Sequence, residues 1–406
     1  MDTKKILQAV LILSLFFCRA SYAKKEPAKK ENAPAATESL STGIDTNDFY
    51  NSKHHWYDIK EAKNVINFEP NQPRYNVKQV KEIADNVLLY QKDNGGWPKN
   101  YDMQAILTKD QTEKVVASKS NLVTTFDNCT TYSHIKYLAK AYQLLKDEKY
   151  KDAAMKGIDF TLSAQYPNGG WPQYYPLQKN YSREITFNDD AMTGVMAMLK
   201  DIIIDNEPYY SIVDKGHRDK IKTAYDKGLD CIFKCQIIDN GKLTGWCQQH
   251  DANTLAPAMA RKYELPSICN REGTTVVLFL MSIDKPSKEV INSVQAAIKW
   301  FDDSKIRGIR VDEFNTPPFQ TPLRLLKTDR RVVEDNNAPP IWARFYELQT
   351  HKPLFSNRQS ERLYSMAEVD RERRAYGWYT YDPQKALDAY PAWQKKWAPQ
   401  QDVLKK

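Results

Sequence analysis

Apolar residues recur every three or four positions through much of the chain, a spacing that predicts helices rather than strands. The first such stretch is 77–90, where Val80, Ile83 and Val87 keep the period. After residue 301 the period weakens, and prolines and arginines become frequent. Only 306–311 and 331–334 favour strands. Helices are expected over 77–90, 127–145, 150–165, 188–203, 221–233, 274–283 and 287–301.

A glycine-rich aromatic turn is repeated along the helical part. It reads NGGWP at Asn94–Pro98 and again at Asn168–Pro172, and a weaker copy lies at Asn240–Trp246. The tryptophans of the three turns are 74 and 75 residues apart, and a fixed period of this size indicates a repeated structural unit. Each turn follows a helical pattern with a late glutamine: Gln91, Gln165 and Gln236.

An acidic motif follows each turn and leads into an apolar helical segment. The three copies are TFDN at 125–128, TFNDD at 186–190 and NRE at 270–272. The unit is therefore helix, aromatic turn, loop, acid and helix, and a ring of such units would bring all the loops to one end. We predict an all-α fold, an α/α toroid-like barrel of about three helical hairpins, with an irregular C-terminal region and few short strands.

The first residues have the features of a secretory signal peptide. Two lysines precede the apolar run Ile6–Phe17, and Ser21-Tyr22-Ala23 is a cleavage pattern. A lipoprotein anchored through Cys18 is disfavoured, because bulky phenylalanines precede that cysteine. We expect a signal peptide at 1–23, a disordered spacer at 24–43, and one domain at 44–406 with a helical core at 76–303 and an irregular region at 304–406.

Composition excludes several classes of function. The formal net charge is +8, but several of the lysines lie in the signal peptide and the spacer, so bulk charge does not favour nucleic-acid binding. No Ser-His-Asp order, phosphate loop or paired-histidine motif is present, and the cysteine spacing matches no zinc site. We expect an exported, monomeric protein without a transmembrane segment in the mature chain.

Four carboxylates near helix starts are the first candidates for chemistry: Asp127, Asp189, Asp190 and Glu272. A plain alternative is helix capping, because a carboxylate there accepts hydrogen bonds from free amides. The Asp189-Asp190 doublet has one acceptor more than a cap needs, and the repeat predicts that all four cluster. Clustered carboxylates require a hard cation, and oxygen ligands suit Ca²⁺.

Further candidates lie on the same loops. Arg261 stands between the third tryptophan and Glu272, and is expected on the loop face. The chain is rich in aromatic residues, with 24 tyrosines and 9 tryptophans, and exposed aromatic rings commonly form the floors of sugar sites. The predicted ligand contacts are Arg344, Arg330, Asn128, Trp97, Trp171 and His250.

Several runs together resemble the family 10 pectate lyases, over residues 94–382. They include NGGWPKN at 94–100, TFDN at 125–128, QYPNGGWPQ at 165–173, FNDD at 187–190, WCQQHD at 246–251, YELPS at 263–267 and PIWARFYE at 340–347. The family has an α/α toroid-like helical domain, which agrees with the fold predicted from the repeat. The resemblance makes 44–406 a catalytic domain.

The resemblance also implies an activity, a Ca²⁺-assisted β-elimination of polygalacturonate. The position that matches the family's base is Arg261, and Asp127 and Asp189 match its cation-binding aspartates. Arg344 would hold the substrate carboxylate, with Arg330 a weaker candidate. The implied partner is an acidic polysaccharide, polygalacturonate or pectate.

Three alternatives stay open on the sequence alone. The first is a non-catalytic pectin-binding or uronate-uptake protein on the same scaffold, and the second is a lyase for a related uronate polymer. The third is a terpenoid cyclase-like α/α barrel, because the Gln-Trp turns fit the repeat of that group. The acidic Asp-x-Asp-Asp motif that such a cyclase needs is absent, since Phe187 precedes Asn188-Asp189-Asp190.

Overall fold

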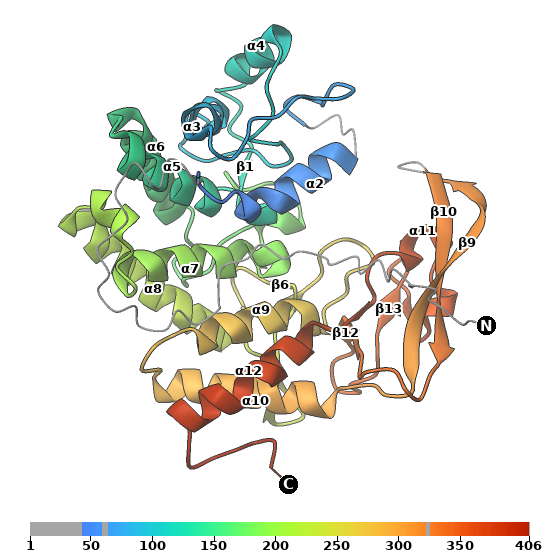
Figure 1. Ribbon diagram of the computed structural model, residues 1–406. Coiled ribbons are helices and arrows are strands. Elements are labelled where there is room, and N and C mark those ends of the chain that lie inside the picture. Colours follow the sequence, from blue (N-terminus) through green and yellow to red (C-terminus); the bar gives the residue numbers. More distant parts are fainter. Residues whose placement is uncertain (1–42, 59–63, 322–324, 406) are drawn as a thin grey trace, which may run out of the picture.

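The computed structural model describes residues 43–58, 64–321 and 325–405. Over these residues the chain forms eleven α-helices, many very short strands and one long hairpin, so the all-α class is confirmed. Helices stack side by side from the N-terminal part to the C-terminal part, and within the described residues they do not close into a barrel (Figure 1). None of the described helices has the length and apolarity to cross a bilayer. The predicted signal peptide and nearly all of the predicted spacer lie outside the described residues.

The principal helices form two layers. In one layer α5 contacts α7, α7 contacts α9, and α9 contacts α12; in the other α3 contacts α6 and α6 contacts α8. The first layer consists of α5 (Tyr132–Leu145), α7 (Ala191–Ile203), α9 (Asn270–Met281) and α12 (Asp382–Trp397). The second consists of α3 (Val80–Tyr90), α6 (Glu148–Ser163), α8 (Lys215–Cys235) and α10 (Lys288–Asp303). The smaller helices are α2 (Tyr50–Asp58), α4 (Lys109–Ala117) and α11 (Arg371–Arg374).

The repeated glutamine and tryptophan hold the units together by hydrogen bonds. Gln91 Nε2 donates to the carbonyl of Gly95 in its own turn and to that of Ala153 in α6, both at 2.9 Å. Trp97 Nε1 donates to the carbonyl of Val87 in the preceding helix at 2.7 Å. The second and third units repeat these bonds through Gln165, Trp171, Gln236 and Trp246.

A fourth unit completes the array. Trp342 Nε1 donates to the carbonyl of Phe301 in α10 at 2.8 Å, as the other three tryptophans do to their own helices. Its strand β11 (Trp342–Ala343) pairs with β15 (Tyr379–Thr380) directly before α12. The sequence period misses this unit because the hairpin of β9 (Ile309–Gln320) and β10 (Leu325–Glu334) is inserted into it. The predicted strands at 306–311 and 331–334 lie at the base of that hairpin.

Two-residue strands join the loops of consecutive units at one end of the helices. β1 (Thr124–Thr125) pairs with β2 (Tyr174–Tyr175), β3 (Ile185–Thr186) with β6 (Gln249–His250), and β8 (Ile268–Cys269) with β12 (Phe345–Tyr346). Each loop that leads into an acidic motif is thereby fixed to its neighbour. The other short strands are β4 (Ile238–Asp239), β5 (Lys242–Leu243), β7 (Pro257–Ala258), β13 (Phe355–Ser356) and β14 (Arg362–Leu363).

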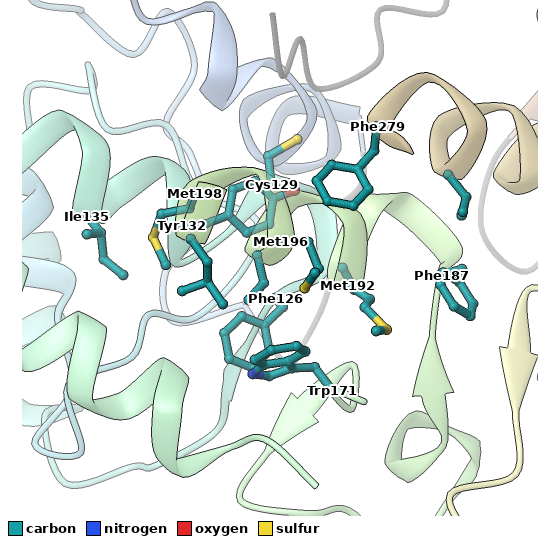
Figure 2. Packing of buried hydrophobic residues seen from close by; sticks show 14 of the residues in the cluster. Phe126, Cys129, Tyr132, Ile135, Trp171, Phe187, Met192, Met196, Met198 and Phe279 are labelled. Atoms are coloured by element: carbon teal, nitrogen blue, oxygen red, sulfur yellow. The ribbon is translucent and has the colours of Figure 1, made fainter. Parts of the chain in front are cut away.

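The core lies between the two layers. Met192, Met196 and Met198 of α7 are buried there with Trp171 of the second turn and Phe279 of α9 (Figure 2). Helix α7 is apolar on most of its surface because neighbouring helices contact it on both sides within its layer and α8 packs behind it. Burial of side chains of this size gives about 1.5–3 kcal/mol each.

The turn glycines provide a stability test of the repeat. Gly169 has a φ of +95°, and a Cβ there would lie 2.0 Å from the carbonyl oxygen of Lys227, so Gly169→Ala forces α8 away from the turn. Gly241 has a φ of +73° with nothing within 4 Å, which makes Gly241→Ala a control for backbone strain alone. We expect urea unfolding to show a loss of at least about 3 kcal/mol for the first variant and about 1 kcal/mol for the second. Equal losses would contradict a close turn–helix contact.

Candidate active site

The acidic motifs of the first two units form matching 3₁₀ turns, η2 (Asp127–Cys129) and η4 (Asn188–Asp190). Asn128, Asp189 and Asp190 all have left-handed backbone, with φ of +53°, +48° and +58°, a conformation that Asn and Asp tolerate better than most residues. No carboxylate of these turns caps a helix by a side-chain hydrogen bond. Capping therefore does not explain these aspartates.

Asp127 is paired with a lysine of the first aromatic turn. Lys99 Nζ lies 2.6 Å from Asp127 Oδ2, and the carboxylate is 2% exposed. Burial disfavours the charged lysine, but Asp127 and, more weakly, Asp189 outweigh it, so the pKa of Lys99 is raised. Asp127 Oδ1 is buried and has no hydrogen-bond partner among the described residues. One carboxylate oxygen thus remains available to a cation.

Asp189 and Asp190 line one small pocket with Glu272, Arg271 and Asn51. Burial raises the pKa of Asp190 to about 7, and the neighbouring Asp189 carboxylate adds to the effect. Asp189 Oδ2 accepts a hydrogen bond of 2.6 Å from Asn188 Nδ2. A positive charge at this pocket would stabilise both carboxylates in their ionised form.

Glu272, predicted as a metal ligand, has an arginine as its partner in the structure. It forms a buried ion pair with Arg344, in which each side chain is 3% exposed, and it also accepts a hydrogen bond of 3.2 Å from Gln248. Burial opposes the ionised form, but Arg344 and Arg271 outweigh it and lower the pKa of Glu272 to about 2. The carboxylate of Glu272 is thus neutralised by Arg344, and the ion pair holds the Arg344 guanidinium in place.

Arg261 lies at the surface of the site, with a side chain that is 41% exposed. Its Nε and Nη2 bind the carboxylate of Glu264 at 2.7–2.9 Å. Burial lowers the pKa of Arg261, but Tyr376 and Glu264 outweigh it and raise the pKa well above its usual value. The guanidinium is fixed and charged, and part of it faces solvent.

Tyr376 brings the two key arginines together, and sequence reasoning did not identify it. Its ring centroid lies 5.6 Å from the guanidinium carbon of Arg261 and 4.9 Å from that of Arg344, and its hydroxyl donates to Glu264. Arg373 stacks on the ring of Tyr263 at 4.2 Å. Arg373 and Tyr376 come from an arginine-rich segment without repeat or motif, so no pattern in the sequence marks them.

The aspartates and the arginines belong to one site. Tyr181 of the second loop has a pKa raised mainly by burial, and Arg261, Glu264, Asp127 and Lys99 all act on its charge. The two acidic turns η2 and η4 contact each other, and Arg344 Nη2 donates to Asn188 Oδ1 of η4 at 3.2 Å. Because Tyr376 lies against both Arg344 and Arg261, it links Arg261 to these turns. The structure therefore brings loops from distant parts of the chain together, as the repeat predicted.

Several predicted substrate contacts have structural positions instead. Trp97 and Trp171 are 0% exposed because their indoles fill the core between the layers. His250 is also 0% exposed, and its two ring nitrogens bond to Cys247 and Leu255. Arg330 is on the hairpin, paired with Glu313 at 2.8 Å. Asn128 is buried, and its amide donates to Asn100 at 3.3 Å.

The fit of the residues to Ca²⁺ depends on oxygen donors. No group of three His, Cys, Asp or Glu side chains in the described parts of the chain is placed to hold a metal ion. Asp127 Oδ1, which lacks a partner there, and the Asp189 carboxylate are the donors that remain. They suit a hard cation whose other ligands come from water or from substrate.

The chain is similar to known polysaccharide lyases. The family model described as Pectic acid lyase matches residues 91–387. The solved Family 10 polysaccharide lyase from Cellvibrio cellulosa is 31% identical, with a TM-score of 0.65, over 76% of this chain and 91% of that chain. A mutant of a Family 10 polysaccharide lyase from Cellvibrio cellulosa, solved in complex with trigalacturonic acid, is also 31% identical, with a TM-score of 0.66. That match covers 76% of this chain and 92% of the other chain.

A search of curated proteins found no match. The family match covers most of the chain and removes the terpenoid cyclase alternative. The chain belongs to the pectic acid lyase family and is a polysaccharide lyase.

Proposed function

We propose that the protein cleaves α-1,4-linked polygalacturonate by Ca²⁺-assisted β-elimination, with Arg261 as the base. The observation that carries this proposal is the position of Arg261, partly exposed and held beside Arg344 by Tyr376, on the same site as Asp127 and Asp189. A polymer lying across Tyr181 would meet cations on one side and carboxylates on the other.

In the proposed reaction Arg261 takes the proton on C5 of a galacturonate. The electron pair of that C–H bond forms a double bond between C4 and C5, and the C4–oxygen bond breaks. The departing oxygen takes up a proton and becomes a new hydroxyl end. The C5 proton is acidic enough only when the charge of the adjacent carboxylate is neutralised, and positively charged groups provide this.

Asp127 and Asp189 would hold the cation, with Asp190 next to them. Bound Ca²⁺ would neutralise the substrate carboxylates and bring them to these aspartates. The Lys99 ammonium already pairs with one oxygen of Asp127 and so offsets the charge of that carboxylate. Arg344 contributes a second fixed charge near Tyr376.

Arg261 carries a protonated guanidinium, as arginines in proteins do, and Tyr376 and Glu264 raise its pKa further against the effect of burial. A guanidinium in that state cannot take a proton. The reaction therefore needs cations next to Arg261 to lower its pKa when substrate is bound, and we expect activity to rise toward alkaline pH. Arg373 contributes such charge, since its guanidinium and that of Arg261 lie against the same ring, that of Tyr263, at 4.2 and 5.5 Å.

An assay on polygalacturonate tests the proposal. Purified protein at alkaline pH is expected to produce the ultraviolet absorbance of an unsaturated product with Ca²⁺, and to lose at least about 100-fold in rate with excess chelator. Restoring Ca²⁺ after chelation should restore the rate, which separates metal loss from damage. Absence of product at every Ca²⁺ concentration would reject the activity and favour the non-catalytic, uronate-binding alternative.

Export through the predicted signal peptide at 1–23 belongs to the same proposal. A pectate polymer is too large to enter a cell intact, so an enzyme acting on it has to work in the periplasm, at the cell surface or outside. Mass spectrometry of the secreted or periplasmic protein is expected to show an N-terminus after Ala23.

A further inference from the structure

A cavity of about 270 Å³ lies beside the site, between the first and second aromatic turns. Lys99 and Tyr181 line it, and these residues also belong to the surroundings of Asp127 and Arg261. Through Lys99 the cavity is therefore adjacent to the Asp127 side of the proposed site. Nothing described so far gives it a function.

Two of the residues that line this cavity, Gln173 and Ser182, each have a buried side-chain oxygen without a hydrogen-bond partner within the described residues. Gln173 is 5% exposed and Ser182 is 3% exposed. Their backbones are bonded to each other, from Gln173 N to Ser182 O at 2.9 Å, which holds the two residues next to each other. A buried polar group without a partner is unfavourable, and a ligand that supplies hydroxyl groups would satisfy both.

The remaining lining is neutral or already paired. Among the described residues it contains two lysines: Lys92 donates to the carbonyl and hydroxyl of Ser118, and Lys99 pairs with Asp127. The neutral donors and acceptors are the side-chain amides of Asn64, Asn100, Asn121, Gln173, Gln178 and Asn180. A carboxylate entering this cavity would lose its hydration without gaining an unpaired cation.

Apolar side chains complete the lining: Val65, Pro98 and Val123. Amides beside small apolar surfaces suit a sugar ring that carries a methyl ester, because the hydroxyls bond to the amides and the methyl group contacts the apolar atoms. On the basis of the proposed function, we propose that this cavity is a subsite for a methyl-esterified galacturonate unit of the polymer.

Binding to inactive protein tests the subsite. The variants Gln173→Met and Ser182→Ala are each made in an Arg261→Lys background. Calorimetry measures how tightly each variant binds hexagalacturonate and its partly methyl-esterified form. Each change is expected to weaken binding of the esterified oligomer about fivefold, which corresponds to the loss of one hydrogen bond, and to leave binding of the free acid unchanged. Gln249→Met is the matched control, because Gln249 Oε1 is also buried without a partner there but lies outside the cavity.

The outcomes separate the subsite from the activity. If the unchanged protein, which keeps Arg261, makes no unsaturated product from polygalacturonate, the proposed function fails. If that activity is intact and the two variants bind both oligomers as the background does, the subsite inference fails. A larger loss with the free acid would also overturn it, since the cavity would then bind a charged unit. Urea unfolding of each variant verifies that the fold is unchanged.

Discussion

Replacing Arg261 by lysine is expected to lower kcat on polygalacturonate by about 10³-fold while polymer binding changes only slightly. Lysine keeps the positive charge, but it cannot reproduce the planar fork that binds Glu264 through Nε and Nη2. The proton acceptor would then no longer be held at the position of the guanidinium. The measurements are the ultraviolet rate at saturating substrate and calorimetric binding without turnover.

Arg331→Lys is the matched control for this variant. Arg331 is also a paired arginine, 3.2 Å from Asp312, but it is 60% exposed on the hairpin. Its replacement is expected to leave the rate unchanged, because exposed ion pairs contribute little. An Arg261→Lys enzyme with the parental rate would assign proton abstraction to another group.

Replacing Arg344 by methionine is expected to lower the free energy of unfolding by about 3–5 kcal/mol. The change leaves the Glu272 carboxylate buried at 3% exposure without its cation. The double variant Arg344→Met/Glu272→Leu is expected to recover much of the loss, because it removes both charges. Urea unfolding of the parent, the single variant and the double variant measures these changes. Lys215→Met is the control, because Lys215 and its partner Asp219 are 90% and 67% exposed, and it is expected to leave the unfolding midpoint unchanged.

The same pair predicts how stability depends on pH. Arg344 and Arg271 hold the pKa of Glu272 at about 2 against burial, below its usual value of 4.5. The carboxylate therefore contributes stability that is complete above about pH 4.5 and is lost as the pH falls toward about 2. Between pH 4.5 and about pH 2, the free energy of unfolding of the parent should fall more than that of the Glu272→Gln variant, as urea unfolding at each pH would show. Parallel curves of unfolding free energy against pH would contradict an ionised, paired glutamate.

Convergence of the loops could be predicted from sequence because it follows from the repeat. Gln91 and Trp97 recur with their spacing, and in the structure each copy makes the same two kinds of hydrogen bond. Equivalent bonds give equivalent turns, so the acidic motifs that follow must lie at the same end of the helices. The fourth unit was not predicted because the hairpin is inserted between α10 and Trp342 and so interrupts the period.

The partners of the charged groups could not be predicted in this way. Glu272 had the position of a metal ligand by analogy with Asp127 and Asp189, yet Arg344 from a segment 72 residues away neutralises it. Trp97 and Trp171 read equally well as core or as sugar contacts, and their full burial decides for the core.

The sequence by itself determined the helical class, the repeated units, the family and the loops that carry the site, because periodicity and spacing are local properties of the chain. Only the tertiary structure decided which carboxylates keep an oxygen for a cation and which arginine remains accessible. Those outcomes depend on contacts between distant segments, such as Tyr376 between Arg261 and Arg344 and Lys99 on Asp127, which no local pattern encodes.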